Sequence, residues 1–415
     1  MTISTAPTTR TTCCIIGGGP AGIMLGFLLA RSGVQVTVLE KHIDFFRDFR
    51  GDTIHPSTLQ LLQELGLLDR FLKLPHSQLD HLSMHIGDRT FPIANFRHLP
   101  TAGKFIALMP QWDFLNFLSA EAAKLPNFSL RMAWEATSLI QNEITNQVMG
   151  VIAQTPNGVQ QIDADLVVGC DGRHATSVAA AHLNVIEQGV PIDVLWLRLP
   201  RQANDPENSL GYVNYGRVII LINRNDYYQC GYIIRKDSYA GIQQAGLPTL
   251  RASIERLVPF LAGRTTELDS WDKIKLLTVQ INHLEQWSIP GLLCIGDAAH
   301  TMSPVGGIGI NIALQDAVAA ANILAEPLRT QSLTTHHLHW VQTYRATAVR
   351  RTQLLQLLAH KFLNRVLQNP GPVTPPLALR ILTRIPGFQY LAARIVGIGF
   401  QPEHIRAAPH PPQTN

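Results

Sequence analysis

The stretch TTCCIIGGGPAGIMLGFLLARSGVQVTVLEK, residues 11–41, decides the fold. It begins with a short apolar run typical of a buried strand, passes through a glycine-rich turn into an apolar helical pattern, and returns to a strand pattern that ends at Glu40. Parallel strands need a long crossover, and that crossover is usually a helix. The order of elements therefore predicts a βαβ unit within a mostly parallel sheet.

The turn in this unit has the spacing Gly17-x-Gly19-x-x-Gly22, and Glu40 follows Gly17 by 23 positions. In dinucleotide-binding units the first glycine permits a tight turn, the second lets a pyrophosphate approach backbone N–H groups, and the third lets the helix pack closely. An acidic residue about 20 positions further on binds a ribose hydroxyl. We therefore predict a dinucleotide site here, with glycines that only close a turn as the alternative.

A second glycine-rich stretch, LLCIGDAAHTMSPVGGIGIN, occupies residues 292–311. An apolar strand pattern delivers Gly296 and Asp297 to its end, and a long helical pattern begins near Asn311. The loop between them contains three glycines: Gly306, Gly307 and Gly309. Free N–H groups and partial positive charge at a helix start, together with glycines that permit close approach, suit a flat, polar-edged, electron-rich ligand.

Composition places the chain among globular enzymes. With 415 residues, 46% of them hydrophobic and 15% charged, it can bury a large core in two or three structural units. No secretory signal pattern and no apolar run of about 20 residues occurs, so we expect a soluble, cytoplasmic protein. The five cysteines are an odd number without CxxC spacing, which favours reduced core thiols, and the histidine groups lack the partners that a metal site needs.

Charge is distributed unevenly along the chain. After Glu326 there are ten Lys or Arg residues against one acidic residue, Glu403, so the C-terminal segment carries +9 and the remainder −5. Such a bias suits an anionic lipid surface or a nearby anionic cofactor, and it does not indicate nucleic acid. Weak peripheral membrane contact through this basic segment is one prediction, and simple packing against the rest of the protein is the other.

Three motifs in this order carry a family resemblance: GGGPAG near the start, Asp171-Gly172 in the middle, and GDAAHTMSPVGGIGIN late. The chain resembles, over nearly its whole length, the group A FAD-dependent monooxygenases, aromatic hydroxylases with the para-hydroxybenzoate hydroxylase fold. The resemblance implies an α/β fold with a Rossmann-like FAD-binding domain, an inserted antiparallel-sheet substrate domain and a helical C-terminal segment. We place the boundaries as follows: FAD-binding domain 11–76, 104–180 and 284–330; substrate-binding β domain 77–103 and 181–283; C-terminal segment with a frayed tail 331–415.

The resemblance also implies one non-covalent FAD and a set of residues around it. Those near its ADP half and pyrophosphate would be Gly17, Gly19, Pro20, Ala21, Gly22, Glu40, Lys41, Arg50, Gln111 and Ala136. Asp297 would bind ribitol, and the isoalloxazine would be faced by Pro304, Gly306, Gly307, Ile308, Gly309 and Asn311. Asp171 and Gly296 are further cofactor-binding candidates. From the residues alone, Arg50 could instead pair with Asp48 or Asp52.

The activity implied is insertion of one oxygen atom from dioxygen, through a flavin C4a-hydroperoxide, into an aromatic or polycyclic small molecule. NADPH or NADH would reduce the flavin. One departure bears on this step, because the Asp-Gly motif usually continues with a serine and an arginine where this chain has Ala175 and Val178. Arg173 could substitute, reduced nicotinamide could bind weakly, or electrons could come from another donor. The alternatives are a flavin dehydrogenase or oxidase and a non-catalytic flavin-binding partner protein.

Substrate contacts are predicted on strands whose period of two turns one face toward a pocket, although such residues could also simply cover a sheet. The candidates are Trp196, Arg198, Tyr212, Asn214 and Tyr232. No general base is obligatory, but His55 is a candidate for relaying a phenol proton, with a helix-entry histidine bonded to backbone as the alternative. We expect a monomer or homodimer.

Overall fold

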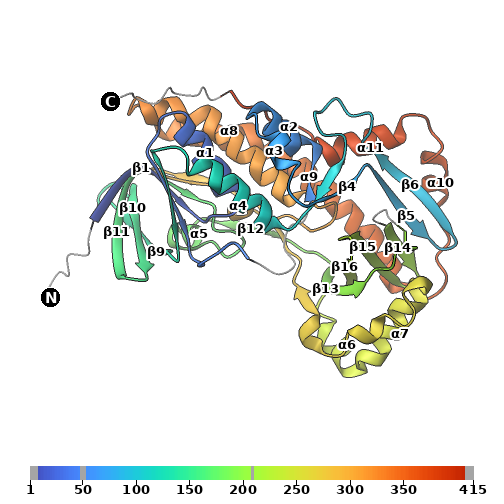
Figure 1. Ribbon diagram of the computed structural model, residues 1–415. Helices are drawn as coiled ribbons and strands as arrows, with labels where there is room; N and C mark the ends of the chain where they lie inside the picture. Colours follow the sequence, from blue (N-terminus) through green and yellow to red (C-terminus); the bar gives the residue numbers. More distant parts are fainter. Residues whose placement is uncertain (1–7, 47–52, 207–209, 407–415) are drawn as a thin grey trace.

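The computed structural model describes residues 8–46, 53–206 and 210–406, so Arg50 lies outside the described residues (Figure 1). A larger sheet follows the order β19-β20-β11-β1-β2-β8, and β10 and β9 extend it from β11. Its strands are β1 (Thr8–Ile16), β2 (Val36–Glu40), β8 (Phe128–Met132), β9 (Glu135–Gln141), β10 (Val148–Thr155), β11 (Gly158–Gly169), β19 (Ser288–Ile289) and β20 (Leu292–Cys294). The five strands from β20 to β8 run parallel to one another, as the βαβ pattern predicts, while β19 and β10 pair with β20 and β11 in the antiparallel sense.

The register of this sheet brings distant sequence motifs to one edge. Ile16 at the end of β1 pairs with Leu39 of β2 on one side and with Gly169 of β11 on the other. Gly169 in turn pairs with Cys294, the last residue of β20. Because all four strands are parallel, the segments that follow them leave the sheet side by side.

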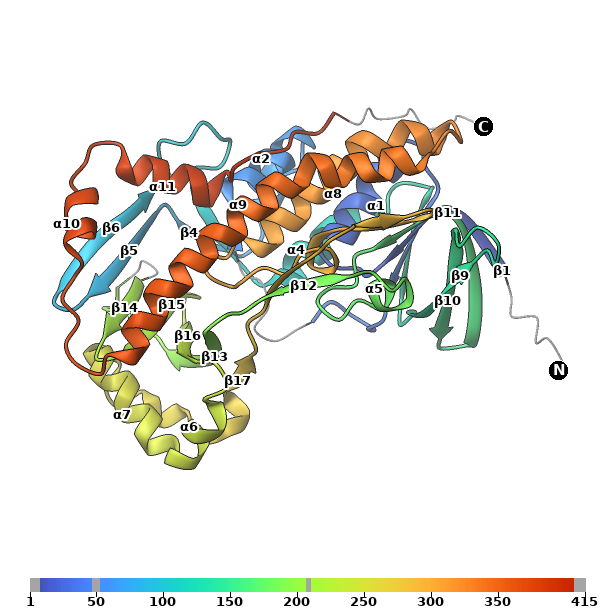
Figure 2. The ribbon, with the colours of Figure 1, turned by 180° about the vertical axis from the view of Figure 1, so that it is seen from behind.

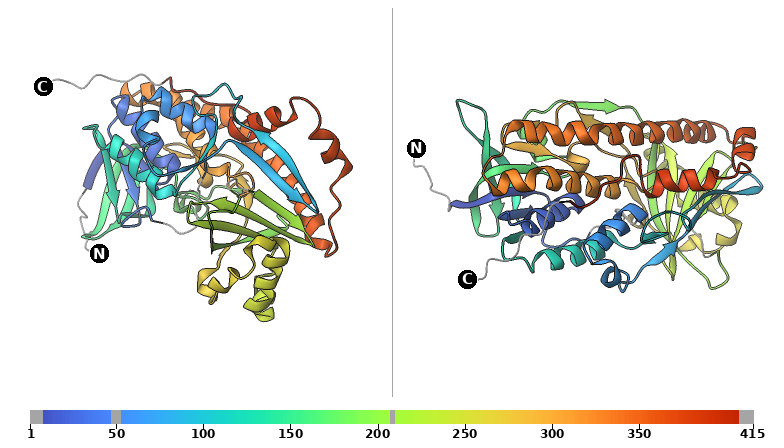
Figure 3. Two further views of the ribbon diagram at one scale, coloured as in Figure 1. Left: turned by 45° about the vertical axis from the view of Figure 1, so that its right-hand side comes forward. Right: turned by 90° about the horizontal axis from the view of Figure 1, so that it is seen from above.

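Helices cover the parallel strands. The helix α1 (Pro20–Arg31) packs against α4 (Gln111–Ala122) and α8 (Gly309–Arg329), and α8 packs against α9 (Thr335–Gln368). Nearly all of α1 is buried, and a Cβ at Gly26 would come within 2.9 Å of Phe128 and Val38, so this glycine permits the close approach of helix to sheet. Seen from above, α8 and α9 run side by side along the molecule (Figure 3).

A second sheet has the order β17-β13-β16-β15-β14-β5-β6 and is antiparallel except between β14 and β5. Its strands are β5 (His81–Ile86), β6 (Arg89–Asn95), β13 (Ile192–Pro200), β14 (Leu210–Asn214), β15 (Arg217–Asn223), β16 (Tyr227–Arg235) and β17 (Lys275–Leu277). Two strands from residues 77–103, β5 and β6, thus share a sheet with strands from residues 181–283, although the domain boundaries themselves stay a prediction. Residues 239–273 are not strands: α6 (Tyr239–Ala245), α7 (Leu247–Leu257) and short 3-10 turns occupy them, and α7 buries Leu250, Ile254 and Leu257.

Smaller elements connect the two sheets and complete the chain. A three-stranded sheet consists of β3 (Thr53–Ile54), β7 (Ile106–Leu108) and β4 (Ser77–Leu79), while β12 (Val185–Gln188) pairs with β18 (Ile281–Leu284). The remaining helices are α2 (Pro56–Glu64), α3 (Leu68–Phe71), α5 (Thr176–Ala180), α10 (Leu377–Leu382) and α11 (Phe388–Gly397). Within the described ranges, none of the helices combines the length and the apolar character needed to cross a bilayer.

Candidate functional site

The glycine-rich turn after β1 lies directly against the segment after β11. The backbone N–H of Cys170 donates to the Ile16 carbonyl at 2.7 Å, and the N–H of Gly17 donates to the Leu39 carbonyl at 2.7 Å. Gly17 has a φ of +103°, and a Cβ there would overlap the Cys170 carbonyl oxygen. A Cβ at Gly22 would overlap the Gly17 carbonyl oxygen. Only glycine fits at these two positions, which is the role that the spacing predicts.

Two helices begin at this edge of the sheet. Gly296, which follows β20, lies between α1 and α8, since its Cβ would be 3.2 Å from the Cβ atoms of both Ala21 and Ala313. No side chain caps the start of either helix. Unpaired N–H groups and the positive ends of two helix dipoles therefore meet at one place, which suits an anionic ligand. At Gly19 a Cβ would meet nothing within 4 Å, so the space that a pyrophosphate needs is open.

Glu40 lies where a ribose-binding carboxylate is predicted. One of its oxygens accepts a hydrogen bond from the Gly18 N–H at 3.0 Å, and the other accepts one from the His42 N–H at 3.1 Å. These contacts hold the carboxylate beside the glycine-rich turn, with Lys41 exposed next to it. Gln111 is the first residue of α4, and Ala136 is buried on β9. Cofactor contacts by these residues stay predictions.

Asp171 of the Asp-Gly motif is held by Ser177, a residue that the sequence pattern did not point to. The carboxylate of Asp171 accepts hydrogen bonds from the Ser177 N–H at 2.9 Å and the Ser177 hydroxyl at 2.7 Å, so it anchors the start of α5. Burial raises the pKa of Asp171. The hydroxyl that holds Asp171 in this chain therefore comes from Ser177, two positions after Ala175. The Nε of Arg173 lies 3.5 Å from a carboxylate oxygen of Asp297, which brings the middle and late motifs together.

Asn311, predicted to face the flavin ring, has its side chain turned into the protein. Its Oδ1 accepts from the His55 N–H at 2.9 Å and from the Thr58 hydroxyl at 2.7 Å. Its Nδ2 donates to the carbonyls of Thr53 at 3.2 Å and Gly307 at 3.3 Å. The Thr53 hydroxyl also donates to the Gly307 carbonyl at 2.8 Å. This amide therefore ties the glycine-rich loop to β3 and α2, and only the backbone of Asn311 remains for a cofactor. The helix begins at Gly309, two residues before the predicted start.

Side chains of α9 form hydrogen bonds with the loop from Thr301 to Val305, and none of these side chains was predicted from the sequence. The amide of Gln356 accepts from the Ser303 N–H at 3.1 Å and donates to the carbonyls of Ser303 at 2.9 Å and Val305 at 3.1 Å. The Nε2 of His360 lies 2.7 Å from the Ser303 hydroxyl, and Gln353 donates to the Thr301 carbonyl at 3.2 Å. The spacing of Gln353, Gln356 and His360, by three and then four residues within the leucine-rich QLLQLLAH, was the available signal.

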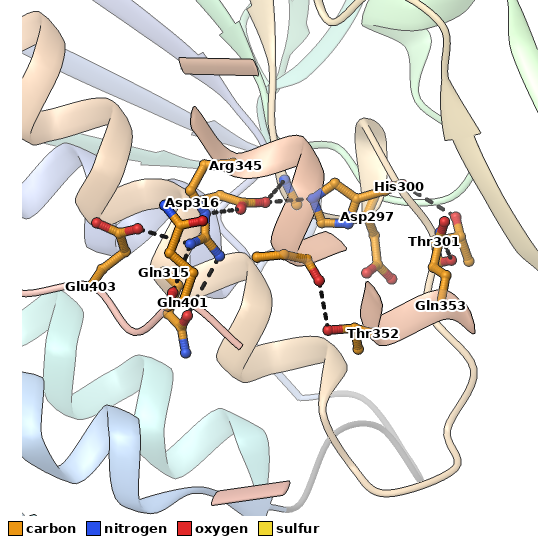
Figure 4. A network of polar contacts seen from close by, with 12 residues as sticks. Asp297, His300, Thr301, Gln315, Asp316, Arg345, Thr352, Gln353, Gln401 and Glu403 are labelled. Carbon is orange, nitrogen blue, oxygen red and sulfur yellow. Dashed lines mark hydrogen bonds and ion pairs between the residues drawn. The ribbon is translucent and has the colours of Figure 1, made fainter. Parts of the chain in front are cut away.

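A buried ionic network lies beneath the late motif (Figure 4). Asp316 of α8 bonds the His300 Nε2 at 2.5 Å, the Arg345 Nε at 3.0 Å and the Gly296 N–H at 3.2 Å. Arg345 also donates to Glu403 at 2.8 Å. Burial on its own would raise the pKa of Asp316, but His300 and Arg345 outweigh it and hold that pKa below its usual value. His300, which belongs to the late motif, is therefore bonded to Asp316 of α8 and has a structural role.

His55, at the start of α2, is fully buried. Its Nδ1 lies 2.8 Å from the Val396 carbonyl oxygen, and burial lowers the pKa of His55 to about 4, so the ring is neutral near pH 7. A carbonyl oxygen can only accept a hydrogen bond, hence Nδ1 carries the proton and Nε2 is an acceptor. Within the described part of the chain Nε2 has no hydrogen-bond partner. A role in relaying a proton stays a prediction.

The five predicted substrate residues do not share one pocket. Trp196 packs in an apolar cluster with Phe96 and with Ala393 of α11, and its buried indole N–H has no partner among the residues described. Tyr212 and Tyr232 belong to another cluster, beneath α7, and the Tyr232 hydroxyl bonds Ser253 at 2.8 Å. The remaining two lie elsewhere. Arg198 is exposed over the ring of Tyr227, and Asn214 accepts from the Val373 N–H at 2.9 Å.

Comparison with known proteins identifies the family. A family model described as FAD binding domain matches residues 10–353, and the chain belongs to this family. FAD is therefore its cofactor, as the resemblance predicted, and the glycine turn, the open space at Gly19 and the two helix starts fit that group.

Particular relatives are more specific. The chain is 29% identical over 395 residues to 6-methylpretetramide 4-monooxygenase of Streptomyces rimosus, covering 93% of this chain and 92% of that protein. It is 25% identical to p-hydroxybenzoate hydroxylase of Acinetobacter baylyi, covering 77% and 78%.

Solved structures agree on the fold. PqsL, a probable FAD-dependent monooxygenase of Pseudomonas aeruginosa, has a TM-score of 0.74 at 18% identity and covers 87% of this chain and 99% of that one. The anhydrotetracycline hydroxylase OxyS of Streptomyces rimosus has a TM-score of 0.73 at 21% identity and covers 97% and 78%. The predicted fold class is confirmed.

Proposed function

We propose that this protein is an FAD-dependent monooxygenase that inserts one oxygen atom from dioxygen into an aromatic or polycyclic small molecule. The observation that carries the proposal is the meeting of three motif loops and two uncapped helix starts around Gly296. The similarity to 6-methylpretetramide 4-monooxygenase over nearly the full length of both chains supports a polycyclic substrate class.

Bound FAD supplies the redox chemistry and the activation of dioxygen. The protein contributes positioning and electrostatics. Reduced flavin carries negative charge near its N1 and C2 carbonyl, and the start of α8 at Gly309 is suited to stabilise that charge. The contacts from Gln356 and His360 hold the preceding loop in shape, and the second sheet is suited to exclude water from the reacting atoms.

We propose that the substrate binds beside the packed apolar cluster between β6, β7 and α11. This cluster contains Phe96, Leu99 and Ile106, with Trp196 at its margin. The neutral Nε2 of His55 can accept a hydrogen bond from a phenolic hydroxyl, and the indole N–H of Trp196 can donate one to a carbonyl. Both groups suit an oxygen-bearing fused-ring substrate. The second substrate is dioxygen. We take the chain to be a monomer or a homodimer. We place it in the cytoplasm because all five of its cysteines are unpaired.

The reductant is proposed to be NADPH or NADH. Arg173 provides a cation close to Asp297 at the meeting point of the middle and late motifs, although the arginine usual in the Asp-Gly motif is replaced by Val178. Anaerobic stopped-flow tests this step, because bleaching of the flavin by either nucleotide supports it. Absence of bleaching with and without substrate indicates another electron donor.

The function is tested with a substrate panel of 4-hydroxybenzoate, simpler phenols and tetracyclic phenols such as anhydrotetracycline. We expect a tetracyclic phenol to stimulate NAD(P)H oxidation and to gain the mass of one oxygen atom. Turnover that yields only a dehydrogenated product, lighter than the substrate by two hydrogen atoms, would instead indicate a dehydrogenase or oxidase. FAD that is bound but never reduced or reoxidised in the presence of any substrate would indicate a non-catalytic flavin-binding protein.

A further inference from the structure

In its middle turns the long helix α9 has polar residues inside and leucines outside, whereas Leu338, Leu363 and Leu367 nearer its ends are buried. Gln353, Gln356 and His360 are buried and bonded to the late loop. On the opposite side of the same turns, Leu354 is 59% exposed and Leu358 is 53% exposed. A surface helix normally shows the reverse pattern. Because the polar contacts occupy the inner side, the apolar residues of these turns are left facing outward.

The outward residues lie on one side of the helix and are here called the α9 outer stripe. Its members are Trp340, Arg351, Leu354, Leu355, Leu358, Lys361 and Arg365, all exposed. From Arg351 onward they are spaced by three, four or seven residues, apart from the adjacent pair Leu354 and Leu355. Trp340 lies eleven residues before Arg351, about three turns earlier on the same side. With 34 residues, α9 is about 50 Å long. It crosses the face of the molecule shown in Figure 2 from end to end.

The charged residues of α9 itself have one sign. The sequence of α9 contains no Asp or Glu. Beyond Glu326 the single acidic residue is Glu403, which is buried and bonded to Arg345. The next helix, α10, continues the pattern with exposed Leu377 and Ile381. The described C-terminal surface thus combines exposed apolar side chains with positive charge that no neighbouring carboxylate of this segment neutralises.

We propose that the α9 outer stripe docks on an anionic lipid surface, with the helix lying parallel to the bilayer. Leucines and a tryptophan would enter the boundary of headgroups and acyl chains, while lysine and arginine would contact lipid phosphates. A second copy of the chain suits this stripe less well. A two-fold interface places the same patch of both subunits together, which would bring two positive stripes into contact. The charge therefore favours an anionic occupant.

The test is sedimentation of the FAD-loaded protein with vesicles. Vesicles that contain phosphatidylglycerol should bind the protein at low salt, vesicles of phosphatidylcholine alone should bind it much less, and added salt should release it. The double variant Leu354→Ser/Leu358→Ser should lower the partition coefficient by roughly tenfold or more, because two partly inserted side chains become polar. Lys361→Glu/Arg365→Glu should lower it by about fivefold or more for each charge.

A matched control is Ile144→Ser/Val159→Ser, which changes two apolar side chains that are 92% and 50% exposed near the larger sheet. This variant should bind vesicles as the unchanged protein does. Retained FAD content and melting temperature show that each variant is folded. The proposal is overturned if the protein binds neither vesicle at low salt or if the leucine variant binds as well as the control. It is also overturned if light scattering shows a dimer that the leucine substitutions dissociate.

Discussion

Gln356 is expected to decide whether the loop from Ser303 to Val305 keeps its shape. The change Gln356→Leu keeps a side chain of similar size and removes all three hydrogen bonds to the loop backbone. A hydrogen bond of this kind contributes about 1 kcal/mol net, and a buried group left unpaired costs about 1–3 kcal/mol. We therefore expect a loss of about 3 kcal/mol.

This loss should fall on FAD binding, because the loop is the segment predicted to face the flavin. If ordering of the loop accompanies binding, about 3 kcal/mol corresponds to roughly 100-fold weaker FAD affinity. The same loss is a sizeable part of the roughly 5–15 kcal/mol that stabilises a folded domain. Titration of the apoprotein with FAD, followed by quenching of flavin fluorescence, measures the first effect, and urea unfolding measures the second.

The control for this variant is Leu354→Gln, on the outer side of the same helix, which should leave both quantities unchanged. A role for Gln356 in ordering the loop would be refuted by two results together. The Gln356→Leu variant would bind FAD within about twofold of the unchanged protein, and its unfolding free energy would stay within about 0.5 kcal/mol of the unchanged value. These results would mean that the loop is ordered by other contacts.

Three further predictions follow from single contacts. Gly22→Ala places a Cβ against the Gly17 carbonyl oxygen and should lower FAD affinity at least about tenfold in the same titration; unchanged affinity would contradict the tight turn. Arg345→Met leaves Asp316 without its buried cation and should cost about 3–5 kcal/mol in urea unfolding, whereas a cost below about 1 kcal/mol would argue against the network. The folded pKa of His55, about 4, lies below its unfolded value of 6.5, so stability should fall by about 3 kcal/mol as pH drops from about 6.5 to 4; His55→Gln should show a shallower fall in urea unfolding, and an identical slope would contradict the assignment.

The parts of the fold that the sequence predicts correctly are those decided by local patterns. Residues 11–41 contain strand, turn, helix and strand in direct succession, so the spacing of apolar residues and glycines is enough. The meeting of the three motifs also follows from sequence, because the carboxyl ends of neighbouring parallel strands share an edge. Here the register of Ile16, Gly169 and Cys294 produces that meeting.

The contacts that support the site could not be predicted in the same way. Asp316 and Arg345 are 29 residues apart, and Arg345 and Glu403 are 58 apart, so no local pattern connects them. Residues 239–273 fold as helices because α7 packs Leu250 and Ile254 on the second sheet, which is a tertiary contact. The burial of the His55 Nε2 and the Trp196 Nε1, which have no hydrogen-bond partner among the described residues, likewise depends on the packing of α11.

This chain uses FAD to insert one atom of dioxygen into an aromatic or polycyclic substrate. The decisive measurement is the mass of the product formed by FAD-loaded enzyme, NAD(P)H and a stimulating tetracyclic phenol under dioxygen labelled with heavy oxygen. We expect one labelled atom in the product, and none when the label is supplied in water instead. A product without label from dioxygen, formed while NAD(P)H is consumed, would contradict it.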